Sequence, residues 1–510
     1  MHQFSFPSIS TAAVIVASTL VLACGGGSAS APSIPVSRLD ESSCPYKLEA
    51  SQKLGTTVRC GVLIVAQDRS SSSNTTIRLP FIVFKSPTAS TLAPIIYLTG
   101  GPGQAWADTV STIRSVDSPG FAGGAKLPRD EVLIEQRGAA TSSPALACTP
   151  VAWGPEMFRD WATAIAAALT GVTSCASVLT ANGTLPAAFN TNELAADVND
   201  LRRLLGYNKV VLNGVSYGTN WALAVLRDYP DSVQSAVLDS VVAQSLRPAL
   251  SAAEGTDKSF KAVADVCAAD PTCNAAYPNL DLRISALLSG LNTTPLIWQR
   301  GPGKQFTAAS ATGVLFSQAM FSQDQFPYTV AVLESALAGA FTLDDLPVQQ
   351  QDNLVEQARE FDTFSSPTVG QYLSINCADN ASVTKAELDA AVLRVRPALQ
   401  PTVHGSLNTF YSACQAWPYR KNLPASTYAP VTSGVPVLLL SGALDPSTQP
   451  AWAKQVAKTL SNSTLVSFPK RGHSVQSLSQ CAQSLVAAFL AGQAVNPACA
   501  AAETLSFRPL

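Results

Sequence analysis

Three residue types in this sequence could together carry out nucleophilic catalysis, and the most clearly marked is a serine between two glycines. The segment Gly214-Val-Ser-Tyr-Gly218 matches the pattern G-x-S-x-G. The short apolar run Val210–Leu212 precedes it, and a segment with helical spacing, Trp221–Tyr229, follows it. Strand, sharp turn and helix are the context in which this pattern lifts a serine hydroxyl out of a sheet. We therefore predict that Ser216 is a nucleophile and that the Tyr217 N–H, at a helix N-terminus, stabilises an oxyanion.

The second residue type is a base. A serine hydroxyl is a weak nucleophile until a base takes its proton, and histidine is the usual base because its pKa lies near working pH. Of the three histidines, His2 lies in an N-terminal leader, and His404 lies in a helical segment, where we interpret it as a surface or capping residue. His473 directly follows the last predicted strand. We therefore expect it to reach the same sheet edge as the sharp turn that carries Ser216, which we call the elbow. We predict that His473 is the base.

The third residue type is an acid that orients the base and fixes its tautomer. Asp445 follows the predicted strand 435–442, and Asp239, its rival, ends the predicted strand 234–240. Some hydrolases place the acid at the latter position. We prefer Asp445 because a turn followed by Pro446 exposes its side chain. The chain order Ser, Asp, His is typical of α/β-hydrolases and differs from the orders of chymotrypsin and subtilisin.

A glycine-rich loop could supply a second oxyanion donor. Gly100-Gly-Pro-Gly-Gln104 follows the apolar strand predicted at 93–99. Glycines let a backbone approach a ligand closely, and Pro102 has no N–H to offer. The donor is therefore Gly101 or Gly103, and we take Gly101 as the candidate.

The elements that must position these residues alternate between strands and helices. A helix is predicted at 192–206, closed by Gly206, and another at 478–490. Strand–helix alternation implies a parallel sheet with right-handed crossovers. The predicted strands are 57–66, 76–84, 93–99, 130–135, 210–212, 234–240, 435–442 and 463–468.

The strand pattern is interrupted once. From 246 to 425 the sequence is helical and in places alanine-rich, and we interpret it as a cap inserted after the sixth strand. The predicted fold is α/β, with a mostly parallel eight-stranded sheet, helices on both faces and this large, mainly helical cap. The core would then comprise residues 44–245 and 426–510.

The N-terminus predicts export. An apolar run too short to span a membrane ends in Val21-Leu-Ala-Cys24, which resembles a bacterial lipoprotein signal with Cys24 as the lipidated residue. Residues 1–23 would be the signal and 24–43 a flexible tether. The alternative is a plain secretory signal cleaved near Ala23. Either way, we expect an exported protein, anchored in the bacterial cell envelope or secreted, whose only membrane contact is the anchor.

The cysteines support this expectation. The sequence has eleven, and setting aside Cys24 leaves ten that can all pair in an oxidising compartment. Zinc spacings such as paired CxxC are absent from the sequence, which favours disulfides. Pairing of nearest neighbours is our hypothesis, and it closes five loops: Cys44–Cys60, Cys148–Cys175, Cys267–Cys273, Cys377–Cys414 and Cys481–Cys499.

The amino-acid composition limits the kinds of binding partner that we expect. Apolar residues make up 47% of the 510 residues and charged residues 13%, which suits a large folded protein with a deep core. There are 33 Lys and Arg against 35 Asp and Glu, so nothing indicates a nucleic-acid partner. We expect a peptide or a small ester as substrate, and the sequence implies neither a metal nor another cofactor.

Several further motifs resemble one family. The chain is similar to the α/β-hydrolase family of prolyl aminopeptidases, and most of all to its secreted tripeptidyl-aminopeptidase branch. The resemblance covers most of residues 44–500. It rests on Gly100-Gly-Pro-Gly103, Glu135-Gln-Arg-Gly138, Gly214-Val-Ser-Tyr-Gly-Thr219, Val237-Leu-Asp239, Leu440-Ser-Gly-Ala-Leu-Asp445, Gly472-His473, Cys377-Ala-Asp379 and Cys414-Gln-Ala-Trp-Pro418.

The resemblance implies removal of N-terminal residues from peptides, either a proline or a tripeptide. Such an enzyme needs an acid in the cap to bind the substrate ammonium, and Asp379, beside Cys377, is our candidate. The sequence departs from the family at the oxyanion loop. Thr99 replaces a histidine, Glu135 replaces an aspartate, and Ala139-Ala-Thr141 replaces Thr-Gly-Arg.

Two other functions remain open from the sequence. An esterase acting on small or lipid-like esters would use the same three catalytic residues. A non-catalytic surface binding protein would keep the fold, but it would have no need of an intact Ser, Asp and His.

Overall fold

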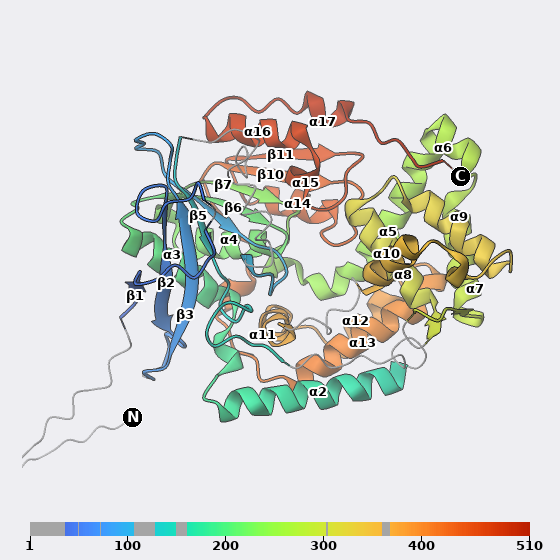
Figure 1. Ribbon diagram of the computed structural model, residues 1–510, viewed down its shortest axis with the longest axis horizontal. Coiled ribbons are helices and arrows are strands. Elements are labelled where there is room, and N and C mark those ends of the chain that lie inside the picture. The colour runs from blue at the N-terminus through green and yellow to red at the C-terminus, as the bar shows by residue number, and fades with distance from the viewer. Residues whose placement is uncertain are drawn as a thin grey trace, which may run out of the picture.

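A computed structural model of the chain describes residues 36–48, 50–71, 73–106, 128–148, 161–301, 304–359 and 368–509. The predicted signal, Cys24 and most of the predicted tether lie outside the described residues. The described chain forms a twisted sheet flanked by helices, with a second group of helices beside it (Figure 1).

The sheet has nine strands in the order β1-β2-β3-β5-β4-β6-β7-β10-β11. The pairs β1–β2, β2–β3 and β3–β5 are antiparallel. The pairs β5–β4, β4–β6, β6–β7, β7–β10 and β10–β11 are parallel, as predicted for a mostly parallel sheet. The strands are β1 Arg38–Asp40, β2 Val58–Ala66, β3 Thr76–Phe84, β4 Ile95–Leu98, β5 Glu131–Ile134, β6 Val210–Val215, β7 Val233–Asp239, β10 Val437–Gly442 and β11 Ser463–Phe468.

The prediction of eight strands was wrong by one. The additional strand, β1, lies within the segment predicted as a tether and pairs with β2, with Arg38 opposite Ile64. Side chains hold this edge in place, because Ser37 donates to Asp200 at 2.6 Å and Arg78 pairs with Asp40 at 2.9 Å. Three residues are too few to show the alternation that marks a strand in a sequence.

Helices cover both faces of the sheet, as predicted (Figure 1). One apolar cluster joins one sheet face to α3, α4 and α14, and another joins the opposite face to α16 and α17. Strand β10 contributes Leu439 to the first cluster and Leu438 and Leu440 to the second. The helices of this part are α2 Trp161–Ala181, α3 Thr191–Leu205, α4 Tyr217–Asp228, α14 Pro450–Ala457, α15 Val475–Leu478, α16 Gln480–Leu490 and α17 Ala498–Ala502.

Local signals explain where α3 begins and ends. The Asn190 side chain accepts the N–H of Glu193, which caps the first turn. Gly206 follows the last turn with φ 86°, a conformation that glycine adopts without strain, as predicted for this helix end. Short 3-10 turns connect the larger elements: η4 Pro186–Ala188, η5 Pro230–Ser232, η6 Gln244–Leu246, η8 Leu343–Asp345, η9 Pro397–Leu399 and η10 Ala425–Tyr428.

The segment between β7 and β10 is mainly helical. Its elements are α5 Pro248–Ala269, α6 Pro271–Ala276, α7 Leu280–Thr293, β8 Leu296–Ile297, β9 Gln305–Phe306, α8 Ala308–Phe321, α9 Phe326–Leu337, α10 Val348–Arg359, α11 Val369–Asp379, α12 Lys385–Val392 and α13 Gln400–Ala416. Residues of α5 to α10, of α12 and of the start of α13 build a further apolar core, which Leu444 from the loop after β10 also joins.

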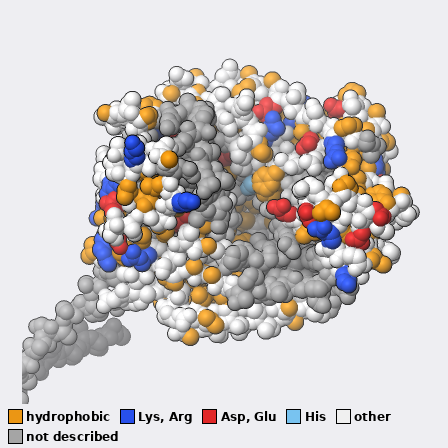
Figure 2. All heavy atoms as spheres, viewed as in Figure 1, with side chains coloured by type: hydrophobic (Ala, Val, Ile, Leu, Met, Phe, Trp, Pro, Cys, Tyr) orange, Lys and Arg blue, Asp and Glu red, His pale blue; other side chains and the backbone are white. Residues whose placement is uncertain are grey.

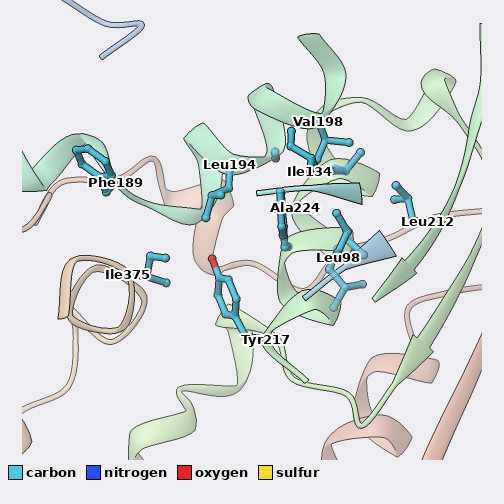
Figure 3. Close-up of a cluster of buried hydrophobic side chains, with 14 of the residues drawn as sticks. Leu98, Ile134, Phe189, Leu194, Val198, Leu212, Tyr217, Ala224 and Ile375 are labelled. Carbon is cyan, nitrogen blue, oxygen red and sulfur yellow. The ribbon is translucent and has the colours of Figure 1, made fainter. Parts of the chain in front are cut away.

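Helix α11 and the end of α13 pack against the sheet side instead. Residues of α11 and of the end of α13 belong to the apolar cluster on the face of α3 and α4. Figure 3 shows Ile375 of α11 across from Tyr217 of α4, with Phe189 and Leu194 nearby. The segment between β7 and β10, which we call the cap, and the sheet side of the chain therefore share one core.

The five predicted disulfides are all present. The structure joins Cys44–Cys60, Cys148–Cys175, Cys267–Cys273, Cys377–Cys414 and Cys481–Cys499. The fourth links α11 to α13 across a separation of 37 residues, so it fastens the part of the cap that packs on the sheet side. The hypothesis of nearest-neighbour pairing is confirmed.

Helix α2 is long and apolar enough to cross a membrane by length and composition alone. It nevertheless packs against α13, where Gly405 leaves room for the Trp161 ring, since a Cβ there would lie 2.0 Å from it. Cys175 on the same helix is bonded to Cys148. These contacts make α2 a helix of the folded domain.

Candidate active site

The predicted elbow forms between β6 and α4. Ser216 has φ 55° and ψ −126°, backbone angles that a non-glycine residue rarely adopts. A Cβ on Gly214 would lie 2.4 Å from the Gly218 carbonyl oxygen, and a Cβ on Gly218 would lie 2.1 Å from the Leu98 carbonyl oxygen. Only glycine fits at either position, because strand, turn and helix approach one another at backbone distance.

Hydrogen bonds hold the elbow to the neighbouring strand. The Ser216 N–H donates to the Asp239 carbonyl at 2.9 Å, at the end of β7. The Thr219 hydroxyl donates to the Ser216 carbonyl at 2.7 Å. Tyr217 begins α4, so its N–H lies in the first turn of the helix, where anions are stabilised.

The predicted acid and base form a buried pair. His473 Nδ1 lies 2.8 Å from Asp445 Oδ2, and the two residues are 5% and 1% exposed. The second oxygen, Asp445 Oδ1, accepts the N–H groups of Ser447 at 2.8 Å and Thr448 at 2.9 Å. Because an ionised carboxylate only accepts hydrogen bonds, the pair places the proton on Nδ1 and fixes the ring orientation.

The pKa of Asp445 lies below its ordinary value. Burial acts to raise this pKa, but the neighbouring His473 and the hydrogen bonds from His473 and Thr448 lower it by more. The Thr448 hydroxyl donates to Asp445 Oδ2 at 2.6 Å. Asp445 is therefore held as the anion that an orienting acid must be.

Asp445 lies in the loop after β10, the acid loop, and His473 lies in the loop after β11, the base loop. Backbone contacts bring these two loops together. The Leu444 N–H donates to the Arg471 carbonyl at 2.9 Å, and the Ala443 N–H donates to the Phe468 carbonyl at 2.9 Å. Both loops follow adjacent parallel strands, β10 and β11, and so emerge at the same sheet edge. The sequence prediction rested on this consequence of parallel pairing.

Asp239, the rival acid, ties the base loop to the elbow. Its carboxylate accepts the N–H groups of Val475 at 3.0 Å and Gln476 at 2.7 Å, while its carbonyl accepts the Ser216 N–H. Burial raises the pKa of Asp239 to about 6, although the bond from Gln476 and the nearby His473 oppose this shift. Asp239 thus links Ser216 to the loop that carries His473, and Asp445 is the partner of His473 Nδ1.

The glycine-rich loop passes beside the candidate nucleophile. A Cβ on Gly100 would lie 3.2 Å from the Ser216 Cβ. Of the two predicted donors, the Gly103 N–H is already engaged, because it donates to Gln136 Oε1 at 3.1 Å. Gly101 therefore remains the candidate donor from this loop.

A buried glutamine organises the loop. Gln136 Nε2 lies 2.7 Å from the Thr99 hydroxyl, 3.2 Å from the Thr99 carbonyl and 2.9 Å from the Gly100 carbonyl. Thr99 in turn donates to the Gln104 carbonyl at 3.1 Å, and Glu135 accepts the Trp106 N–H at 3.0 Å. The positions at which the sequence departs from the family pattern, Thr99 and Glu135, belong to this network.

Asp379, the candidate for binding the substrate ammonium, is buried among side chains of the chain itself. Its buried carboxylate accepts bonds from Gln244 at 2.7 Å, Asn220 at 2.9 Å and Thr191 at 3.2 Å. Burial raises its pKa to about 6 against the effect of these bonds. The carboxylate therefore joins α11 to α3, α4 and η6, and its binding of a substrate ammonium stays a prediction.

The cap contributes an aromatic side chain that the sequence did not single out. Phe321, the last residue of α8, is 42% exposed, and its ring centroid lies 6.1 Å from that of His473 with the planes at 80°. A phenylalanine near a helix end gives no sequence signal of its own, because only the fold brings it to the base. Figure 2 shows the surface hollowed between the sheet side and the cap helices.

The structure also describes His404 and the side chains that could bind a metal ion. His404 lies exposed on α13 beside Asn408, as interpreted from the sequence. Within the described part of the chain, His, Cys, Asp and Glu side chains nowhere gather in a group of three or more that could hold a metal ion.

Two family models match the chain. One, described as alpha/beta hydrolase fold, matches residues 93–275, and one described as TAP-like protein matches residues 401–499. The chain is 24% identical over 473 residues to serine protease Hip1 of Mycobacterium tuberculosis and to that of Mycobacterium bovis. The match covers 86% of this chain and 86% of the relative.

Solved structures also resemble the chain at low identity. Proline iminopeptidase of Mycobacterium smegmatis is 14% identical with a TM-score of 0.38, over 82% of this chain and 95% of that one. MGS-M2, an alpha/beta hydrolase enzyme from a Medee basin deep-sea metagenome library, is 13% identical with a TM-score of 0.37. The match covers 83% of this chain and 96% of the MGS-M2 chain.

Proposed function

Since the chain belongs to the α/β-hydrolase superfamily, we propose that it is an exported serine peptidase that removes N-terminal residues from peptides through an acyl-enzyme. The observation that carries the proposal is the buried Asp445–His473 pair, 2.8 Å apart, at the sheet edge where the strained Ser216 elbow emerges. A strained nucleophile and an oriented base are the parts that acyl transfer requires.

In this mechanism Ser216 attacks the scissile carbonyl while His473 takes its proton. The negative charge that develops on the carbonyl oxygen is stabilised by the N–H groups of Tyr217 and Gly101. His473 then gives the proton to the leaving amine, and a water deprotonated by the same imidazole releases the acyl group. Asp445 keeps the imidazole in the required tautomer throughout and stabilises its cationic form.

Three findings support a peptidase rather than an esterase. The relatives with 86% coverage are named serine protease, and the TAP-like match lies over the segment that includes Asp445 and His473. The family resemblance of the sequence implies an aminopeptidase.

The proposal of export rests on the ten paired cysteines. Five disulfides in one chain are typical of proteins that fold in an oxidising compartment. The signal over 1–23 and the lipid on Cys24 are part of the same proposal. Metabolic labelling with a lipid precursor tests the anchor: a Cys24→Ala variant should lose the label and leave the membrane fraction.

The activity is tested with paired substrates on the purified mature protein. Tripeptidyl and aminoacyl anilides with a free amine should be cleaved, and blocking that amine should abolish cleavage. Ser216→Ala should lower turnover by a factor on the order of 10⁶. Ser177→Ala, on the exposed side of α2, is the matched control and should leave turnover unchanged. Cleavage of nitrophenyl esters alone would refute the peptidase proposal and leave an esterase.

A further inference from the structure

The candidate base is held from the cap as well as from the sheet. The His473 N–H donates to the Met320 carbonyl at 2.9 Å, and Met320 lies in the last turn of α8. Gly472 makes this contact possible, because a Cβ there would lie 2.1 Å from the Ala319 carbonyl oxygen and 2.4 Å from that of Met320. The base loop and the end of α8 therefore meet backbone to backbone.

One side chain arranges the carbonyls that meet the base loop. The last carbonyls of a helix have no partner within the helix and need one elsewhere. Gln323, just after α8, folds back so that its Nε2 donates to the Ala319 carbonyl at 2.9 Å and to the Met320 carbonyl at 2.8 Å. It is 3% exposed, so water does not readily substitute for these bonds.

The acid loop receives a parallel contact from another cap helix. The Ser259 hydroxyl of α5 donates to the Leu444 carbonyl at 2.6 Å, directly before Asp445. On the same helix, the Ser251 carbonyl accepts Gln449 Nε2 at 2.9 Å. Both members of the acid–base pair thus sit on loops that cap helices hold.

We propose that Gln323 is a positioning residue for His473, acting through the Met320 carbonyl. The cap thereby sets the place of the base in addition to covering the site. The inference rests on the proposed function for its kinetic consequence, although the contact itself can be measured without any activity. Nothing in the sequence motif around His473 indicates a partner 150 residues earlier, so the assignment comes from the fold.

The test replaces Gln323 with methionine, which keeps the length of the side chain but removes the donor. Gln323→Met should lower kcat by about tenfold to a hundredfold, as expected for small misplacement of a catalytic group, with KM changed less than about twofold. The rate of labelling by a fluorophosphonate should fall in parallel, because it also depends on proton removal from Ser216. Hydrogen exchange at the His473 amide should become faster.

The matched control lies on α8 itself. Gln318 is 2% exposed, and its Nε2 donates within the cap, to Thr329 at 2.9 Å and Gln357 at 3.1 Å. Gln318→Met should therefore disturb the cap to a comparable degree while leaving kcat and exchange at the His473 amide close to wild type. Equal losses of kcat in the two variants would overturn the positioning role and leave a general effect of cap stability.

Two readouts separate this inference from the proposed function. If the wild type cleaves neither anilides nor esters and does not react with the fluorophosphonate, the proposed function fails, and exchange at the His473 amide alone decides the contact. Unchanged exchange in Gln323→Met overturns the inference whatever the activity. Gln323→Glu, which keeps the shape but sets an acceptor against two carbonyls, serves if the methionine variant does not fold, and the same losses are expected from it.

Discussion

At the scale of single residues, Gly218 carries a steric demand that can be tested directly. A methyl group at this position would lie 2.1 Å from the Leu98 carbonyl oxygen and 2.7 Å from its carbon, both backbone atoms of β4. Neither strand nor helix can yield without moving the elbow. We expect Gly218→Ala to lower the free energy of unfolding by about 3 kcal/mol or more, at the upper end for overpacked sites, as measured by urea denaturation.

Gly434 is the matched control for that substitution. The nearest atom to a Cβ there is the Ser461 hydroxyl oxygen at 3.9 Å, an ordinary contact distance. Gly434→Ala should leave the free energy of unfolding within about 0.5 kcal/mol of wild type. A loss of the same size in both variants would show that the close approach of α4 to β4 is not what excludes a side chain at Gly218.

Asp379 leads to a prediction about pH. Burial raises its pKa to about 6 from 3.8, so as the pH falls the native state binds this proton before the unfolded state does. The contribution of Asp379 to stability therefore increases as the pH falls from 7 to 5, by about 1 kcal/mol. Relative to Asp379→Asn, which cannot titrate, the wild type should gain that amount over this range in urea denaturation. A difference that is independent of pH would contradict the raised pKa.

Whether the position of a site residue could be predicted from the sequence depends on whether the strand order alone places it. Ser216, Asp445 and His473 could be predicted to lie at one sheet edge because each is in the turn or loop after a parallel strand. The internal partners of Asp379 could not be predicted, because they come from α3, α4 and η6. A single sequence gives no signal for a contact among four distant segments.

At the scale of elements, the glycine-rich loop depends on a side chain from a neighbouring strand end. Gln136 is fully buried and bonds to Thr99 and to the Gly100 carbonyl. Gln136→Met removes these bonds while conserving most of the volume. We expect kcat to fall about a hundredfold, as for the loss of one oxyanion donor, with a smaller change in KM for anilide substrates.

Thr99→Ser is the informative comparison for the loop. Serine keeps the hydroxyl that donates to the Gln104 carbonyl and accepts from Gln136, so kcat should stay within about threefold of wild type. A loss in Thr99→Ser as large as that in Gln136→Met would mean that packing of the threonine methyl, rather than the hydrogen bonds, shapes the loop.

The elements themselves followed from pattern wherever a pattern was long enough. The nine-residue strands β2 and β3 were predicted from their alternation, although most of their residues are buried, and α3 shows helical spacing with a clear end at Gly206. β1 was missed because it is three residues long and polar at both ends. The packing of α11 on the sheet side could not be predicted either, because its apolar residues fit a cap core or the sheet-side core equally well.

At the scale of the whole molecule, the end of the chain connects the two halves. Residues 503–509, which we call the C-terminal strap, leave α17 on the sheet side and run to the cap near α9 (Figure 1). At its start Glu503 pairs with Arg471 of the base loop. At its end the Arg508 N–H donates to the Asp324 carbonyl at 3.0 Å, and the Arg508 carbonyl accepts the Tyr277 hydroxyl at 2.6 Å.

The strap also contributes apolar and cationic packing. Leu505 and Phe507 lie against the apolar core of the cap, and both are partly buried. The Arg508 guanidinium lies 3.9 Å from the centroid of the Tyr328 ring. Half-burying two large apolar side chains and making one cation–π contact together stabilise the docked strap by roughly 2–4 kcal/mol.

A chain ending at Ala502 should therefore keep the sheet but loosen the cap. We expect its free energy of unfolding to fall by roughly 2–4 kcal/mol and limited proteolysis to cut first between α5 and α10, because that part loses one of its links to the base loop. kcat should fall as well, since the end of α8 holds the His473 loop and the strap bonds to the residues just after α8. A chain ending at Arg508 keeps every contact described above and should match the wild type. If the shorter chain matched it too, the cap would hold the base without help from the strap, and the contacts of Glu503 and Arg508 would be incidental.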